Sequence, residues 1–352
     1  MSAPVEIAGR AIGPGEPVYV IAEAGVNHDG DVDRALALVD AAAAAGADAV
    51  KFQTFDPAAL ASDGAPLAEY QQGRVEAESQ RAMLDRLALG EDDFRRLAGH
   101  ARDRGVAFLS TPFDEGSAEL LERLGVPAFK VGSGELTNLP LLASLARRGR
   151  PLLVSTGMAT IDEVGAAVRA VREAGSPPLV LLHCLSAYPA PADQANLRAI
   201  GTLREAFGVP VGWSDHCLEL EPTLAAVALG AVVVERHLTL DRTAAGPDHS
   251  MSSEPPELAE LIRRIRVVEA ALGDGVKRPQ QAELDTRAVA RRSLVATRDL
   301  AAGERINAGD VAIKRPGGGL EPRELERLVG ARLALAVRRD EPFAERHLAS
   351  DG

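Results

Sequence analysis

Two histidines at the ends of neighbouring apolar runs are the residues of this chain best suited to chemistry. One run, Val211–His216, ends in a histidine, and a second run ends at His237, twenty-one residues further along. A strand, a helix and a second parallel strand fit that interval, so both imidazoles are expected at the carboxyl ends of adjacent strands. Neutral imidazole is a common metal ligand, and the pair therefore suggests a metal site. Imidazoles also serve as hydrogen-bonding groups in half-buried sites. Two histidines alone do not decide between metal binding and that role.

The elements that must position these histidines alternate between short apolar runs and helix-like segments. The runs are apolar almost throughout, which is typical of parallel strands covered on both faces. Eight strand–helix units in about 250 residues predict a (β/α)8 TIM barrel. A doubly wound open sheet is the alternative, but no glycine-rich fingerprint follows the first run. The predicted strands are 18–25, 49–55, 107–113, 128–134, 152–158, 179–188, 211–216 and 232–238.

After Gly273 the alternation of apolar runs and helix-like segments ends, and a polar segment is followed by short strand-like runs. We expect a barrel domain over residues 1–273, a polar linker over 274–287 and a small β-rich domain over 288–352. In the small domain, short strands are expected at 293–297, 311–314 and 333–337, with a dense group of proline and glycine between the last two.

Composition limits the class of protein. The net charge of −12 over 352 residues argues against nucleic acid or an anionic membrane as a bulk partner. Two cysteines imply no disulfide framework and fit a reducing compartment. No run resembles a signal peptide or a membrane span, so a cytoplasmic protein is expected.

Nearly every predicted strand ends in polar or ionisable side chains although its body is apolar. In a parallel barrel these ends face the site, so the groups are expected to meet in one place. They are Glu23, Lys51, Gln53, Ser110, Thr111, Lys130, Ser133, Glu135, Ser155, Thr156, Cys184, Ser186, Tyr188, Ser214, Asp215, His216, Glu235, Arg236 and His237.

Lys51 and Lys130 need an anionic partner, because a lysine within an apolar strand is costly to bury. Structural ion pairs with Glu23 and Glu135 are one explanation. The hydroxyl groups on neighbouring strand ends favour another: a small substrate with both carboxylate and phosphate groups, whose oxygens lysines and hydroxyls share.

Glu23 and Asp248 are candidates for acid–base work or for binding sugar hydroxyls. Asp248 lies in a Gly-Pro-Asp-His segment and has a simpler explanation as a turn former after proline. His183 is expected to pack inward, and Cys184 and Cys217 are expected to fill space near the site, since no neighbouring base marks either as a nucleophile.

The ordered motifs resemble those of the sialic acid synthases over the whole chain. The tail, with Lys314-Arg-Pro-Gly-Gly-Gly, resembles that family's C-terminal antifreeze-like (SAF) domain. The other motifs are Ile21-Ala-Glu-Ala-Gly-Val-Asn-His-Asp-Gly, Lys51-Phe-Gln-Thr, Ser110-Thr-Pro-Phe, Lys130-Val-Gly-Ser-Gly-Glu, Ser155-Thr-Gly-Met, His183-Cys, Trp213-Ser-Asp-His, Glu235-Arg-His and Gly246-Pro-Asp-His.

The resemblance implies condensation of phosphoenolpyruvate with the open-chain form of an N-acylated amino sugar. The acceptor would be 2-acetamido-mannose or a 2,4-diacetamido-6-deoxy relative, and the products a nonulosonate and phosphate. It also implies a divalent ion, Mn²⁺ or Mg²⁺, held by His216 and His237. Such an ion would polarise the sugar carbonyl, and two protein ligands leave its other positions open to oxygen.

The resemblance also assigns roles to individual residues. Glu135 would lie between the two substrates, and Arg315 would reach the N-acyl group from the tail of the other subunit, implying a domain-swapped homodimer. Phosphoenolpyruvate would be held by Lys51, Thr111, Lys130, Ser133, Ser155, Ser186 and Ser214, and the sugar by Glu23, Gln53, Tyr188 and Asp248.

The chain departs from the family pattern at two places. Ser186 stands where some members have asparagine, which shortens or removes a phosphate contact. The loop Tyr70–Ser79 has no asparagine where members often carry one that touches the sugar. The first departure bears on phosphate binding and the second on which sugar is accepted.

Two other functions fit parts of the sequence. A Schiff-base aldolase on the same barrel would use Lys51 or Lys130 as its nucleophilic amine. A non-catalytic carbohydrate- or ice-binding protein would work through the small tail domain, but it would have no need for the polar strand ends.

Overall fold

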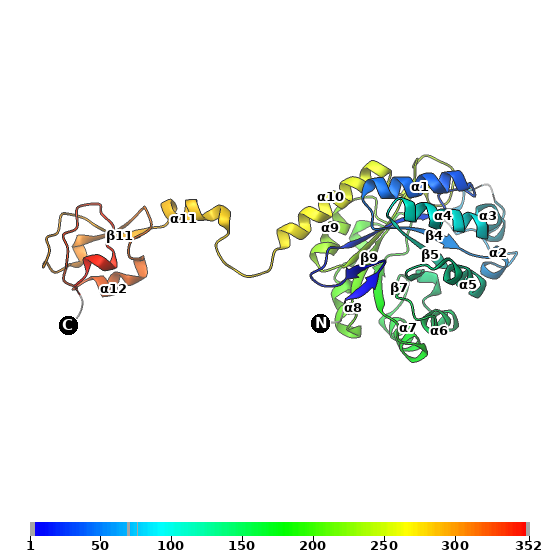
Figure 1. The fold of residues 1–352 in the computed structure, drawn as a ribbon, viewed down its shortest axis with the longest axis horizontal. Coiled ribbons are helices and arrows are strands. Elements are labelled where there is room, and N and C mark those ends of the chain that lie inside the picture. Colours follow the sequence, from blue (N-terminus) through cyan, green and yellow to red (C-terminus); the bar gives the residue numbers. More distant parts are fainter. Residues whose placement is uncertain (1–3, 69–70, 76, 350–352) are drawn as a thin grey trace. The chain divides into compact units, whose positions relative to one another are not determined.

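The computed structural model describes residues 4–68, 71–75 and 77–349. The chain forms two compact units, Met1–Gly273 and Asp274–Gly352, and each is described by itself (Figure 1).

The first unit is built around eight parallel strands. They follow one another in the order β5-β4-β3-β10-β9-β8-β7-β6. The two end strands of this order, β5 and β6, lie next to one another but share no ladder of hydrogen bonds among the described residues. The predicted (β/α)8 barrel is therefore confirmed, with one open seam. The strands are β3 (Tyr19–Gly25), β4 (Ala49–Thr54), β5 (Ala107–Pro112), β6 (Phe129–Val131), β7 (Leu152–Ser155), β8 (Leu179–Cys184), β9 (Val211–Asp215) and β10 (Val233–His237).

Helices surround the strands, as Figure 1 shows. Local sequence explains where they begin and end. Asp31 accepts hydrogen bonds from the first turn of α1, and Gly46 ends it with a left-handed φ of 84°. The helices are α1 (Val32–Ala45), α2 (Pro57–Leu60), α3 (Gln80–Leu87), α4 (Glu91–Asp103), α5 (Glu115–Leu124), α6 (Leu139–Arg147), α7 (Ile161–Ala174), α8 (Ala199–Phe207), α9 (Glu221–Ala228) and α10 (Pro255–Leu272).

A short antiparallel hairpin, β1 (Val5–Ile7) with β2 (Arg10–Ile12), precedes the barrel and was not expected from the sequence. Its buried Val5, Ile7 and Ile12 pack with the side chains of the barrel interior, such as Leu153 and Val180. The larger cluster lies between the strands and the helices. Packing on both faces explains why the strand bodies are apolar throughout.

The second unit has its own small core, which includes Leu294, Leu328 and Phe343. It contains α11 (Leu284–Ala290), β11 (Ser293–Ala296), β12 (Val311–Lys314) and α12 (Leu325–Leu328), with β11 and β12 antiparallel. The strand expected at 333–337 is wrong, because only its two ends form isolated bridges. The segment expected to be a plain linker contains most of α11.

Across the described residues, we find no helix with the length and apolarity that crossing a membrane requires.

Candidate active site

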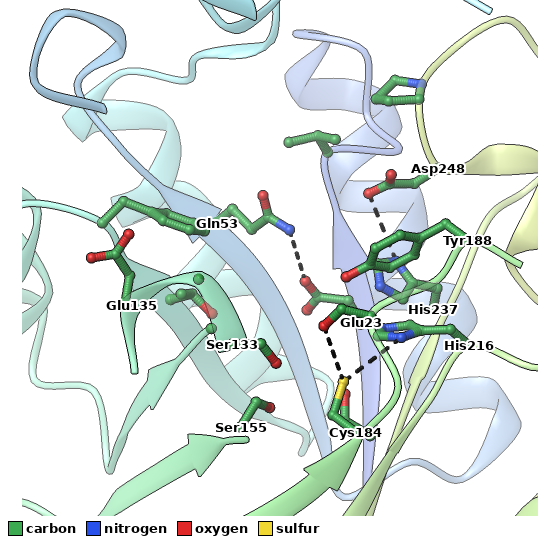
Figure 2. A pocket seen from close by; sticks show the side chains of 18 of the residues that line it. Glu23, Gln53, Ser133, Glu135, Ser155, Cys184, Tyr188, His216, His237 and Asp248 are labelled. Carbon is green, nitrogen blue, oxygen red and sulfur yellow. Dashed lines mark hydrogen bonds and ion pairs between the residues drawn. The ribbon is translucent and has the colours of Figure 1, made fainter. Parts of the chain in front are cut away.

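One cavity of about 470 Å³ opens at the carboxyl ends of the barrel strands. It is lined by every residue of the first unit to which the resemblance gave a substrate- or metal-binding role. Figure 2 shows several of them converging from different strands. They are Glu23, Lys51, Gln53, Thr111, Lys130, Ser133, Glu135, Ser155, Ser186, Tyr188, Ser214, His216, His237 and Asp248. Ser110, Thr156, Asp215 and Arg236, also expected at the strand ends, are not among its lining.

The two histidines lie next to one another in the wall of this cavity. His216 follows β9 and His237 ends β10, and β9 and β10 are paired in the sheet. Their ring centroids are 5.3 Å apart (Figure 2). The Nδ1 of His216 donates to the backbone oxygen of Leu185 at 2.9 Å, so in the neutral ring the lone pair is on Nε2.

His237 provides the second free nitrogen. Its Nδ1 is buried without a hydrogen-bond partner, and the nearest carboxylate oxygen, on Asp248, is 3.9 Å away. Burial, helped by His216 and the nearby lysines, holds the pKa of His237 well below its usual value, so the ring is neutral. An orphaned, neutral imidazole nitrogen beside a second imidazole fits a metal ligand pair.

The pair fits an open metal site rather than an enclosed one. Among the described residues, no group of three or more His, Cys, Asp or Glu side chains is arranged to hold an ion. His216 and His237 alone would leave most coordination positions to water and substrate oxygens, which suits Mn²⁺ or Mg²⁺ better than a structural zinc.

The two lysines belong to a buried charge cluster in the same cavity. Lys51 Nζ lies 2.7 Å from the Glu23 carboxylate and 3.1 Å from Thr111 Oγ1. It also lies 3.8 Å from Glu235. Burial alone would lower the pKa of Lys51, but Glu23 and Glu235 outweigh it and hold the pKa above its usual value.

Lys130 is held by a different set of partners from the one expected. Its Nζ lies 3.4 Å from Glu235, and it donates to Ser155 Oγ at 2.8 Å. The ion pair suggested with Glu135 is wrong, because Glu135 is half-buried and accepts a hydrogen bond from Asn138 instead. Burial lowers the pKa of Lys130 despite the attraction of Glu235.

Glu235 was among the strand-end residues expected to meet, but no binding or catalytic role was predicted for it. It lies between the two lysines and accepts from Ser214 Oγ at 3.2 Å, while its Oε2 makes no hydrogen bond. Burial would raise its pKa, but Lys130 and Lys51 outweigh burial and lower it. Strand alternation explains its position, because Glu235 and His237 are two residues apart and therefore face the same side.

The alternate residues of the same two strands point the other way. Asp215 and Arg236 are buried and form an ion pair outside the ring of site residues. Arg236 also donates to Ser253 Oγ and to the backbone oxygens of Leu218 and Glu219. The ion pair links the end of β9 to the end of β10, next to the two histidines. Its two opposite charges compensate each other.

A hydroxyl-lined corner lies beside Lys130. Ser133 Oγ accepts from the backbone N–H of Gly157 at 3.0 Å. A Cβ at Gly157 would lie 2.3 Å from Ser186 Oγ and 2.8 Å from Ser133 Oγ, so only glycine allows this approach. Ser186 packs closely against Gly157 in this corner. The longer asparagine that some family members have at this position would need more space there.

Another part of the cavity carries the groups expected to bind the sugar. Gln53 donates to Glu23 at 3.2 Å (Figure 2), and burial raises the pKa of Glu23 to about 7 although Lys51 opposes it. Burial raises the pKa of Asp248 to about 6. Tyr188 lies close to His216, with ring centroids 4.4 Å apart.

The remaining predicted residues have different positions. Arg315 is exposed on the second unit, and its role stays a prediction. In the loop Tyr70–Ser79, Tyr70 and Glu76 lie outside the described residues. His183 packs inward as expected, against Trp213 and with Nε2 at 2.9 Å from the Ala195 backbone oxygen.

Both cysteines are buried and free. Cys184 lines the cavity, with its Sγ 3.8 Å from His216 Nδ1 (Figure 2). Cys217 is absent from the side chains that line the cavity. Burial would raise the pKa of Cys184, but His216 outweighs burial and lowers it.

A parallel barrel with buried lysines, hydroxyls and paired imidazoles at its carboxyl end is typical of an enzyme of the (β/α)8 class. Comparison with known proteins gives its family. The chain belongs to the NeuB family, whose model matches residues 38–277, and a SAF domain matches residues 291–349. The family resemblance seen in the motifs is thereby confirmed.

Two relatives bear the name N,N'-diacetyllegionaminic acid synthase. The one from Legionella pneumophila is 46% identical, over 90% of each chain. The one from Campylobacter jejuni is 42% identical, over 93% of this chain and 98% of its own. The crystal structure of an N-acetylneuraminic acid (sialic acid) synthetase from Leptospira borgpetersenii, in complex with citrate, matches with a TM-score of 0.73 and 35% identity, over 81% of this chain and 95% of its own. This chain is accordingly an enzyme, a synthase of the transferase class.

Proposed function

We propose that this enzyme works in the cytoplasm and condenses phosphoenolpyruvate with the open-chain form of an N-acylated amino sugar. The products would be a nonulosonate and inorganic phosphate. The observation that carries the proposal is that Lys51 and Lys130 meet hydroxyl groups in the same cavity as the adjacent pair His216 and His237. Two cations with hydroxyls suit a small carboxylate–phosphate substrate, and the imidazoles suit the carbonyl of the second substrate.

The reaction needs only phosphoenolpyruvate, the sugar and one water molecule, and its atoms balance with these three. C3 of phosphoenolpyruvate bonds to the aldehyde carbon of the sugar, water adds to C2, and the C2–O bond to phosphate then breaks. Lys51, Lys130, Thr111 and Ser155 would hold the anionic groups of phosphoenolpyruvate close to the acceptor. Glu23, bonded to Gln53, would bind sugar hydroxyls or orient the water.

His216 and His237 would hold the divalent ion, Mn²⁺ or Mg²⁺. When bound there, such an ion would supply Lewis-acid polarisation of a carbonyl oxygen. The protein's own part is to orient both rings and to keep His237 neutral. The Leu185 backbone oxygen orients His216, and burial lowers the pKa of His237.

The test is phosphate release from phosphoenolpyruvate with a panel of amino sugars. We expect release with 2-acetamido-mannose, with its 2,4-diacetamido-6-deoxy relative, or with both. A chelator should stop it and Mn²⁺ should restore it. Release with no sugar of the panel, or full activity in excess chelator, would contradict the proposal. A borohydride-trapped adduct of a lysine with a keto acid would favour a Schiff-base aldolase instead.

We also propose that a domain-swapped homodimer completes the site, with Arg315 of one subunit reaching the N-acyl group of the sugar in the other. The family resemblance supports this role, and the side chain is exposed and therefore available for it. The second unit would then help to exclude water from the reaction.

Replacing Arg315 by alanine is expected to raise the KM for the sugar by about tenfold or more, because a hydrogen bond from a charged group is lost. The KM for phosphoenolpyruvate should change by less than about twofold, since the lysine cluster is intact. Steady-state kinetics with each substrate varied in turn measure both. Arg323→Ala is the matched control, because Arg323 is an exposed arginine of the same unit that pairs with Glu321 at 2.9 Å. Equal losses for the two substrates would contradict the proposed role.

A further inference from the structure

Five apolar side chains gather on one side of the cavity, where Gln71 and Gln80 also line it, whereas the remainder bears charges and hydroxyls. The five apolar side chains are Val26, Leu60, Met83, Leu84 and Phe113, which we call the apolar wall. Val26 follows β3 and Phe113 follows β5, while the other three belong to α2 and α3 in the long connection after β4. The wall is thus made by the loops after three neighbouring strands.

The apolar wall is the exposed edge of a separate hydrophobic cluster. Val26 and Met83 are buried in that cluster together with Phe55 and Leu87. Phe55 and Phe113 pack edge to face, with ring centroids 6.2 Å apart. Because neighbours hold the wall from behind, its surface is formed before any substrate arrives. Leu60, Leu84 and Phe113 are only half-buried, so they still offer apolar surface to the cavity.

The position of the wall relates it to the acceptor sugar. Glu23 on β3 and Gln53 on β4 lie at the ends of the strands whose loops form the wall. The histidines lie at the ends of β9 and β10, on the other side of β3 in the sheet order. On the proposed function, an acceptor with its carbonyl at the histidines and its hydroxyls at Glu23 and Gln53 directs its remaining substituents toward the apolar wall.

We propose that the apolar wall selects an acceptor whose far end carries methyl groups, namely a 6-deoxy, di-N-acylated hexose, over one that carries a hydroxymethyl and free hydroxyls. This inference rests on the proposed function and specifies its substrate. A methyl group against the wall replaces water by apolar contact. A hydroxyl held against these five side chains loses its water and gains no hydrogen-bond partner from them. Discrimination between such substrates in an apolar pocket is about tenfold to a hundredfold.

Three leucines of the same cluster make a matched test. Leu60 and Leu84 line the cavity, whereas Leu67 packs on the same cluster without lining it. All three are half-buried, so glutamine in each place disturbs the cluster to a similar extent. Only the first two changes place a polar group against the substrate.

The measurement is the ratio of kcat/KM for the 2,4-diacetamido-6-deoxy sugar to that for 2-acetamido-mannose. In the unaltered enzyme the ratio should exceed one. Leu60→Gln and Leu84→Gln should each lower it by about tenfold. Leu67→Gln should leave it within about twofold, and Leu84→Met should keep it close to the original value. The Tm of each variant shows whether it is folded.

The outcomes separate this inference from the function on which it rests. A ratio below one, an unchanged ratio in folded Leu60→Gln and Leu84→Gln, or an equal fall in Leu67→Gln would overturn the selective role of the wall. Phosphate release would continue in those cases. If no sugar supports phosphate release from phosphoenolpyruvate in the unaltered enzyme, the proposed function itself fails.

Discussion

Replacing His237 or His216 by alanine is expected to lower phosphate release by about a thousandfold or more. Polarisation of a carbonyl by a bound ion contributes several kcal/mol, and each replacement removes one of the two protein ligands proposed for that ion. Titration with Mn²⁺ by calorimetry is the second measurement, and each variant should bind the ion far more weakly than the unaltered enzyme.

His100→Ala is the control for both histidine variants. His100 lies on α4, where its Nε2 pairs with Asp40 on the outer helices at 2.6 Å. It is absent from the side chains that line the cavity. Its replacement should change neither activity nor Mn²⁺ affinity. If the His216 and His237 variants bound Mn²⁺ as tightly as His100→Ala does, the two-histidine metal site would be wrong.

Replacing Lys130 by methionine is expected to have two separate effects. Loss of a buried cation that stabilises substrate charge should lower kcat/KM for phosphoenolpyruvate by about a hundredfold or more. The variant also removes one of the two buried lysines that pair with Glu235, which lies 3.4 Å from Lys130 Nζ. Breaking a buried ion pair in this way costs about 3–5 kcal/mol of unfolding free energy.

A second variant separates these two effects. Lys130→Met combined with Glu235→Gln removes the unmatched charge, so it should recover most of the stability lost in urea denaturation. It should not recover the affinity for phosphoenolpyruvate. Lys277→Met, which changes an exposed lysine, is the control for both measurements. Recovery of activity together with stability would show that Lys130 acts only as a structural ion-pair partner.

The barrel was predictable because its signal is repeated. Each strand is an apolar run followed by a helix with its own start and stop residues, as at Asp31 and Gly46. The hairpin of β1 and β2 was missed because three-residue strands have no periodicity to detect. In the second unit, residues 333–337 are apolar enough for a strand, but non-local packing leaves only single bridges at their ends.

Which residues line the cavity was predictable in the first unit, because strand ends in a parallel barrel share one face. The pairing among them was not. Lys130 on β6 could meet a carboxylate from any strand across the barrel, and the sequence gives no measure of that distance. Glu135, five residues away in the chain, was the nearest candidate, but Glu235 on β10 is the partner. The non-catalytic binding protein considered as an alternative is wrong, since the chain belongs to a family of synthases.

The open seam between β5 and β6 gives the barrel one place where its diameter can change without rupture of a main-chain ladder. Thr111 is on β5 and Lys130 is on β6, so both edges of the seam contribute to the cavity. A ligand bound to both Thr111 and Lys130 would link β5 to β6 across the seam where the main-chain hydrogen bonds are interrupted. In amide hydrogen exchange, protection gained on ligand binding should then concentrate along these two strands, with less gain at the continuous junction of β9 and β10.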